Sequence, residues 1–335
     1  MDQTAAAAES QIDDESRDGT PDDGFSRIPV VGLGGSAGSI PALGRFLEGV
    51  SVPSGLAYVV ILHLSPDHES ILAELLQRHT SMPVVQVREA VTVERDRVYV
   101  IPPGHALGMA DGQLELADLP PRQSRHVAVD LFFRALAESH GPHATAIVLS
   151  GLDGDGAIGI KRIKERGGLT IAQDPDEAEY GAMPRSAIDT GMVDWVLPAA
   201  EMGRRVARYV ALESRVQLPE DDADDESDAV SPGRAPADQE LREVLNLLRT
   251  RTGRDFSGYK RATIVRRIGR RMQVNEVQAF ADYVGCLRTR PGEAEALLQD
   301  LLISVTNFFR DPECFAALEQ EIPALFIDKS ANGAL

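Results

Sequence analysis

The feature that most constrains the fold is an alternation, between positions 28 and 212, of short apolar runs with longer amphipathic segments. The short runs are rich in Val and Ile and apolar at consecutive positions, which is typical of strands buried on both faces. The longer segments have the length of the crossover helices that parallel strands require. The sequence therefore predicts an α/β domain with a mostly parallel, doubly wound sheet. We expect strands at 28–33, 56–62, 82–87, 96–101, 143–150, 167–173 and 192–198, and helices at 40–50, 70–79, 129–140 and 157–167.

Two regions depart from this alternation. Residues 105–119 contain Asp111-Gly112, a pair typical of two-residue turns, and predict an antiparallel hairpin attached to the sheet. From about position 237 the strand signals stop and apolar residues recur with helical spacing; Ile264, Ile268 and Met272, four positions apart, would form one apolar ridge. This second region predicts a small all-α domain. Its helices are expected at 237–251, 259–272, 277–290, 293–304 and 312–326.

The charge of the chain lies mainly in two segments. Of a formal net charge of −18, residues 1–24 carry −7 and residues 213–240 carry −8, which leaves −3 for the rest. Acidic segments with few apolar residues do not bury enough surface to fold. We therefore divide the 335 residues into modules that follow these shifts. The predicted modules are a disordered acidic tail (1–26), the α/β domain (27–212), an acidic linker (213–237), the helical domain (238–328) and a truncated end (329–335).

Several classes of protein are disfavoured by composition. The chain has two cysteines, Cys286 and Cys314, which are not spaced as in a zinc site. Two are also too few for the disulfide framework of a secreted protein. No apolar run approaches the roughly 20 residues of a spanning helix, and the acidic start is unlike a signal peptide. The sequence predicts a cytoplasmic protein without membrane insertion, metal or cofactor.

A glycine-rich loop follows the first predicted strand. Gly32, Gly34 and Ala37 fit the G-x-G-x-x-A spacing of a dinucleotide site, but that site also needs an acid at the end of the second strand. The second strand ends at His63 instead, which disfavours nucleotide binding. The same loop reads as G-x-S-x-G around Ser36, the turn that presents a nucleophilic serine.

A base and an acid for Ser36 follow other predicted strands. His63 ends the second strand, and Asp153 and Asp155 follow the strand at 143–150. Because the carboxyl ends of parallel strands share one edge, these side chains are expected to meet there. The order Ser, His, Asp differs from that of α/β-hydrolases. A structural alternative remains, in which the glycines serve a tight turn and the polar residues cap helices; His105, in a later loop, could line the same cleft.

Five blocks of the chain resemble the catalytic domain of CheB-type protein-glutamate methylesterases. They are 30–43, 59–76, 98–105, 148–168 and 172–198, and the resemblance covers about 28–210. It implies Ser36 as nucleophile, His63 as general base and Asp155 as third member of a triad. It also implies the amides of Leu152 and of the glycine loop, at Ala37, as oxyanion donors.

The resemblance also implies a substrate. The substrate would be glutamyl methyl esters on the cytoplasmic helices of chemotaxis-type receptors, with glutamine deamidation as a second activity and no metal or nucleotide. Two positions depart from the family: Asp153 stands where Gly is common, and Ser39 replaces a second Gly after Gly38.

The helical region resembles the N-terminal domain of CheR-type methyltransferases, through 259–272 and 301–312, as in CheB–CheR fusion proteins. Methyl transfer would need a further domain for S-adenosylmethionine, so we expect none from this chain, which would be a piece of a longer sensory protein. Residues 249–274 hold nine bases and one acid. This excess of positive charge would attract an acidic receptor helix rather than nucleic acid. The alternative is that these bases only form a solvated surface. The docking residues predicted are Arg266, Arg267, Arg270 and Arg271. The competing hypothesis for the whole chain is a non-catalytic receptor-docking or regulatory module.

Overall fold

The computed structural model describes residues 28–64, 70–118, 127–218 and 234–302. The predicted acidic tail, most of the linker, the helix at 312–326 and the end of the chain lie outside these residues.

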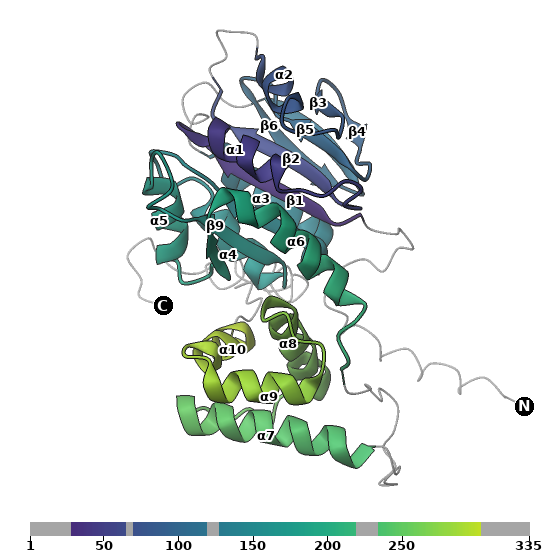
Figure 1. Cartoon of the computed structure of the whole chain (residues 1–335), viewed down its shortest axis with the longest axis vertical. Coiled ribbons are helices and arrows are strands. Elements are labelled where there is room, and N and C mark those ends of the chain that lie inside the picture. Colours follow the sequence, from purple (N-terminus) through teal and green to yellow (C-terminus); the bar gives the residue numbers. More distant parts are fainter. Residues whose placement is uncertain (1–27, 65–69, 119–126, 219–233, 303–335) are drawn as a thin grey trace, which may run out of the picture. The chain divides into compact units, whose positions relative to one another are not determined.

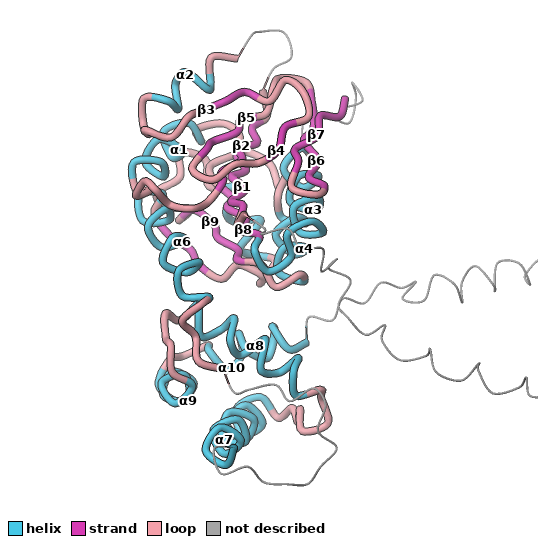
Figure 2. Tube along the Cα trace, turned by 90° about the vertical axis from the view of Figure 1, so that its right-hand side faces the viewer, coloured by secondary structure: helices cyan, strands magenta, loops and turns pink. Residues whose placement is uncertain are grey.

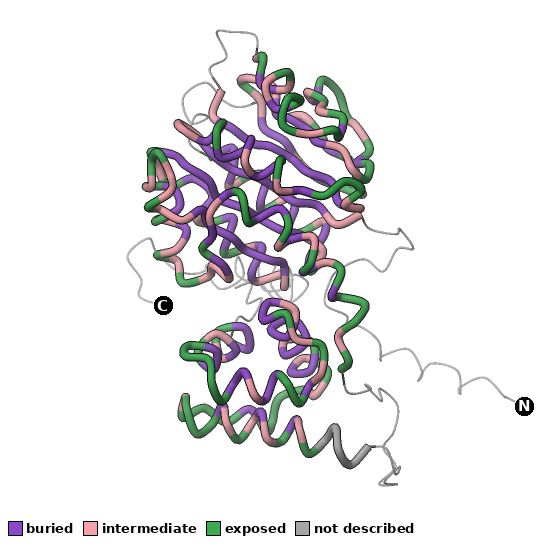
Figure 3. The backbone as a smooth tube through the Cα atoms, viewed as in Figure 1, coloured by how far each residue is buried: buried purple, intermediate pink, exposed green. Residues whose placement is uncertain are grey.

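A seven-stranded parallel sheet forms the centre of the α/β part (Figure 1). Its order is β10-β9-β8-β1-β2-β5-β3, so the chain winds in one direction from β1 and then returns to the other side. The seven strands that the sequence predicts are all present. The inner strands are buried at their consecutive apolar positions (Figure 3), which is typical of a sheet covered on both faces, whereas Val85 and Val196 on the two edge strands are exposed. The strand bounds are β1 (Val30–Gly35), β2 (Ala57–Leu62), β3 (Val84–Gln86), β5 (Arg97–Val100), β8 (Ala144–Val148), β9 (Leu169–Gln173) and β10 (Trp195–Leu197).

Helices cover both faces of this sheet (Figure 2). One core contains side chains of α1 (Ser39–Glu48), α2 (Leu72–Gln77) and α6 (Ala199–Glu213). The other contains those of α3 (Ala128–His140), α4 (Ala157–Glu165) and α5 (Ala182–Asp189). Four of these helices were predicted from their hydrophobic periodicity, whereas α5 and α6 were not.

The predicted hairpin is present, but it belongs to a different sheet. β6 (His105–Ala110) and β7 (Gln113–Asp118) are joined by Asp111 and Gly112, whose φ angles of 47° and 74° suit a type I′ turn. β7 pairs with β4 (Val91–Thr92), which completes a separate three-stranded sheet. The expectation that the hairpin joins the parallel sheet was therefore wrong. Its apolar side chains pack in the core around α3 instead.

The helical part contains α7 (Arg234–Thr252), α8 (Arg261–Val274), α9 (Phe280–Thr289) and α10 (Glu293–Leu302). These helices share a core of their own, into which Ile264, Ile268 and Met272 of α8 are buried as the predicted ridge. Among the helices that the structure describes, we find none with both the length and the apolar character needed to cross a bilayer.

Candidate active site

Ser36 occupies the turn between β1 and α1. Its amide donates a hydrogen bond of 2.9 Å to the carbonyl of Ser150, which ties the loops after β1 and β8 together. Gly38 adopts a φ of 72° at the start of α1, a conformation that favours glycine. Buried Ser39 closes the turn, since its hydroxyl donates to the Ser36 carbonyl at 2.6 Å. The turn therefore fixes Ser36 at the carboxyl edge of the sheet, where α1 begins.

The register of the sheet places His63 beside this turn. β1 and β2 are adjacent and parallel, and Gly35 pairs with Leu62. Ser36 and His63 are therefore the next residues of neighbouring strands, which run about 4.8 Å apart. Gly151, in the loop after β8, lies on the other side; a Cβ built on it would be 3.0 Å from the Cβ of Ser36. Residues that follow three strands thus gather around Ser36.

Asp155 engages the imidazole of His63. The Nε2 atom of His63 lies 2.8 Å from Oδ2 of Asp155, whose side chain is fully buried. Because a carboxylate only accepts, Nε2 carries the hydrogen. The amides of Val129, Asp130 and Gly156 also donate to this carboxylate, each at 2.9 Å. Asp155 is thus oriented from several sides.

Two of those amides belong to the first turn of α3, where the helix dipole compensates a negative charge. This contribution of α3 was not predicted from the sequence. The predicted helix start at Val129 was the only signal for it, and nothing in the pattern joined that start to Asp155.

Asp153 lies against the other ring nitrogen. Its Oδ2 is 3.3 Å from Nδ1 of His63, and its Oδ1 accepts the amide of Asp155 at 3.1 Å. Burial lowers the pKa of His63, but the hydrogen bond and charge of Asp155, together with the charge of Asp153, outweigh it and raise that pKa. The imidazole is thus held between two carboxylates.

The remaining predicted site residues differ in their surroundings. Leu152 follows Gly151 in the loop beside Ser36, and its side chain is exposed. Ala37 follows Ser36 directly, and its carbonyl accepts the Ser150 hydroxyl at 2.9 Å. His105 begins β6, and its Nδ1 makes a local contact of 2.7 Å with the carbonyl of Pro103.

The glycines of the first loop have a packing role. A Cβ built on Gly34 would lie 2.2 Å from Cγ1 of Val129, and one on Gly32 would lie 3.0 Å from the rings of Phe132 and Phe133. The absence of side chains lets α3 approach β1 closely. The glycine spacing is therefore explained without a nucleotide.

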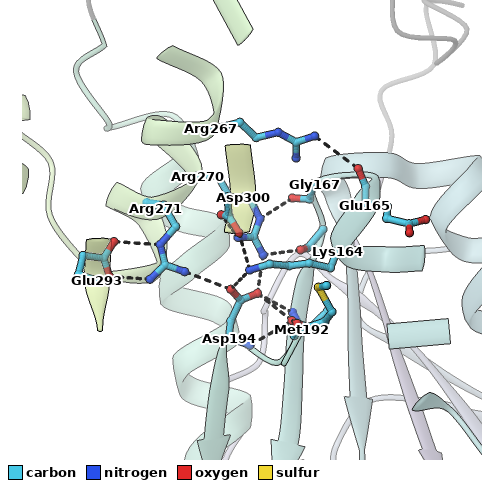
Figure 4. A network of polar contacts seen from close by, with 12 residues as sticks. Lys164, Glu165, Gly167, Met192, Asp194, Arg267, Arg270, Arg271, Glu293 and Asp300 are labelled. Atoms are coloured by element: carbon cyan, nitrogen blue, oxygen red, sulfur yellow. Dashed lines mark hydrogen bonds and ion pairs between the residues drawn. The ribbon is translucent and has the colours of Figure 1, made fainter. Parts of the chain in front are cut away.

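The four predicted docking arginines are not equivalent; Figure 4 shows three of them, Arg267, Arg270 and Arg271. Arg270 and Arg271 are buried, whereas Arg266 is exposed and half-buried Arg267 donates to the carbonyl of Glu165 at 3.5 Å. The prediction of an exposed docking surface is wrong for Arg270 and Arg271, because neighbouring carboxylates and carbonyls enclose them.

Arg270 contacts the α/β part directly. It donates to the carbonyls of Gly167 and Gly168 at 3.0 and 2.7 Å and pairs with Asp194. It also pairs with Asp300 of α10 at 2.6 Å, and Asp300 in turn lies 2.8 Å from Nζ of Lys164. Arg271 forms a two-bonded pair with Glu293 and a 3.3 Å pair with Asp194. A buried charge network therefore joins the two parts.

A doubly wound parallel sheet that carries a serine, an imidazole and a buried carboxylate at its carboxyl edge is the architecture of a hydrolytic enzyme. Residues 31–206 match the sequence profile of the family described as CheB methylesterase. Because this match spans more than half of the 335 residues of the chain, the chain belongs to the CheB methylesterase family. Residues 239–302 match a second profile, the all-alpha domain of CheR methyltransferases.

Two similar proteins differ in how much of this chain they match. A protein of Rhodobacter capsulatus described as "Uncharacterized 104.1 kDa protein in hypE 3'region" is 35% identical over 78% of this chain and 29% of its own length. The protein-glutamate methylesterase FrzG of Myxococcus xanthus is 32% identical over 54% of this chain and 55% of its own length. The chain thus spans only part of these relatives.

A solved structure shows the same fold. The CheB methylesterase catalytic domain of Thermotoga maritima superposes with a TM-score of 0.51 at 26% identity, which covers 54% of this chain and 98% of that domain.

Proposed function

We propose that the chain hydrolyses glutamyl methyl esters on chemotaxis-type receptors, with Ser36 as nucleophile, His63 as general base and Asp155 as the group that orients the base. The observation that carries this proposal is the 2.8 Å contact of His63 with buried Asp155, at the edge where the register sets Ser36 beside His63. A serine and an imidazole on a fixed carboxylate form the arrangement that activates a hydroxyl for acyl transfer.

The reaction would proceed in two balanced stages. Oγ of Ser36 attacks the ester carbonyl while its proton passes to Nδ1 of His63, since Nε2 is held by Asp155. The tetrahedral intermediate collapses, and His63 returns the proton to the methoxy oxygen, which leaves as methanol. Water, activated by the same nitrogen, then hydrolyses the acyl-enzyme and releases the glutamate carboxylate and Ser36.

The negative charge on the carbonyl oxygen needs donors during both stages. We assign this role to the amides of Ala37 and Leu152. Support comes from their position, since Ala37 follows Ser36 and Leu152 follows Gly151, which packs against the Ser36 side chain. Backbone donors in two fixed loops require no reorganisation when the charge develops.

A glutamine side chain would react at the same centre, with ammonia as the leaving group in place of methanol. Relatives in Anaeromyxobacter dehalogenans carry the name protein-glutamate methylesterase/protein-glutamine glutaminase. We therefore propose deamidation as the second activity of the site. For the helical part, which matches only the all-alpha CheR domain, we propose receptor docking in the cytoplasm rather than methyl transfer.

The test is methanol release from a methylated receptor fragment by the full chain. Ser36→Ala should abolish release, while Ser81→Ala, which removes an exposed hydroxyl, should leave it unchanged. A serine-reactive phosphonate should label Ser36 and no other serine. Equal release by Ser36→Ala and wild type would rule out the mechanism. Receptor binding without any hydrolysis would favour the alternative of a non-catalytic docking module.

A further inference from the structure

The imidazole of His63 has a carboxylate at each of its nitrogens. Nε2 lies 2.8 Å from Asp155 and Nδ1 lies 3.3 Å from Asp153. We propose that Asp153 is a positioning residue that acts through His63: it stabilises the protonated imidazole, so that the site becomes active at a higher pH than Asp155 alone would require. This inference rests on the proposed function.

Protonation changes the number of hydrogens on the imidazole ring. A neutral imidazole has one N–H, whereas the protonated ring has two. With Nε2–H directed to Asp155, a neutral His63 would point the lone pair of Nδ1 toward an oxygen of Asp153. Protonation replaces this repulsion by a second charge-assisted hydrogen bond. The proton on Nδ1 then occupies the position that must receive the proton of Ser36.

The environment preserves the interaction between these charges. The side chains of His63 and Asp153 are only 10% and 23% exposed, so water screens them weakly. Two further carboxyl groups, those of Asp130 and Glu179, lie near this site. Asp130 of α3 lies beside Asp155, and burial, then the charge of Asp155, raises its pKa. Glu179 packs against Gly38. Of these four acids, Asp155 and Asp153 act on the pKa of His63 and raise it against the effect of burial.

Asp153 also has a local structural role. Its Oδ1 accepts the amide of Asp155, two residues later, as in an Asx turn. An asparagine keeps an oxygen for this turn and removes the charge, whereas a glycine removes both. Comparison of Asp153→Asn with Asp153→Gly therefore separates the charge from the turn.

Because Asp153 is negatively charged, we expect the profiles of kcat/KM against pH for wild type and Asp153→Asn to cross. Asp153 stabilises the imidazolium in the resting site, which hinders catalysis at low pH, and also in the transition state, which helps at high pH. On the acid limb, Asp153→Asn should exceed wild-type kcat/KM by about three- to fivefold, because a charge so close strongly affects a titration. On the high-pH plateau it should be slower than wild type.

The experiment measures kcat/KM against pH for wild type, Asp153→Asn and Asp153→Gly on the methylated receptor fragment. The control is Asp176→Asn, which removes the same charge from a side chain that is 92% exposed and should not move the profile. Both Asp153 variants should shift the acid limb to lower pH. If only Asp153→Gly loses activity and the acid limb of the kcat/KM profile does not shift in either variant, the inference is wrong and Asp153 acts only through the turn that it forms with the amide of Asp155.

A second readout does not depend on hydrolysis. The ring of His63 is titrated by ¹⁵N NMR in full-length Ser36→Ala, with and without Asp153→Asn, and assigned by replacing His63. The midpoint should fall when the charge is removed; an unchanged midpoint overturns the inference even if the esterase is active. A fall in the midpoint with no hydrolysis by wild type would instead reject the proposed function and leave the effect of Asp153 on His63 established.

Discussion

Arg270 of α8 and Asp194, the residue before β10, form a buried ion pair between the helical and the α/β parts. The same carboxylate also accepts from Lys164 at 2.5 Å and from Arg271 at 3.3 Å. Removing one partner of a buried ion pair leaves buried charge that is less well compensated, and here only Asp300 and Glu293 would remain to pair with the three cations.

The first prediction concerns stability. Asp194→Asn should lower the free energy of unfolding by about 3–5 kcal/mol, because three cations lose their common acceptor. Chemical denaturation followed by circular dichroism measures the change. Glu276→Gln is the matched control: its pairs with Arg205 and Arg208 are partly exposed, and their loss should cost less than about 1 kcal/mol. Equal losses in the two variants would contradict the role of burial.

The second prediction is a dependence of stability on pH. Burial raises the pKa of Asp194, but the charges of Arg270, Lys164 and Arg271 outweigh it and hold that pKa far below its ordinary range. A carboxyl of this kind stabilises the fold above its ordinary pKa, and the contribution is lost as pH falls toward the folded value. The free energy of unfolding should therefore decline below about pH 4. In Asp194→Asn this decline should be shallower, and an identical slope would speak against the assignment.

The third prediction concerns the first glycine loop. Gly34→Ala would place a methyl group 2.2 Å from Val129, at the start of the helix whose amides hold Asp155. We expect a loss of about 1–3 kcal/mol from overpacking, together with reduced methanol release. Gly285→Ala adds the same group in open space on α9 and should not destabilise the chain. Full activity in Gly34→Ala would show that the close approach of α3 is dispensable.

The fourth prediction concerns docking. Of the four predicted docking arginines, Arg266 is the exposed one, so an acidic receptor helix that binds the helical part should be sensitive to its charge. Arg266→Glu should weaken binding about fivefold, and less at high salt, because an exposed charge contributes about 1 kcal/mol. Binding to immobilised receptor fragment measures this effect. Arg204→Glu, which reverses an exposed charge on α6, serves as control; equal weakening by both variants would indicate a nonspecific effect of charge.

The fold was largely predictable because its signals are local. The buried strands are apolar at consecutive positions, and Ile264, Ile268 and Met272 recur at helical spacing, so each element is specified by its own residues. The turn Asp111-Gly112 specified the hairpin. It did not specify that β7 pairs with β4 in a second sheet, since hydrogen bonds between strands depend on partners distant in sequence.

By itself the sequence determined the strands, most of the helices and the residues that follow each strand, including Ser36, His63 and Asp155. Only the tertiary structure decided what those residues meet. Asp153 reaches the second nitrogen of His63 because two loops converge, and Arg270 is buried because residues outside α8 enclose it. Periodicity describes one element along its own axis, whereas burial and charge compensation depend on which other element covers it.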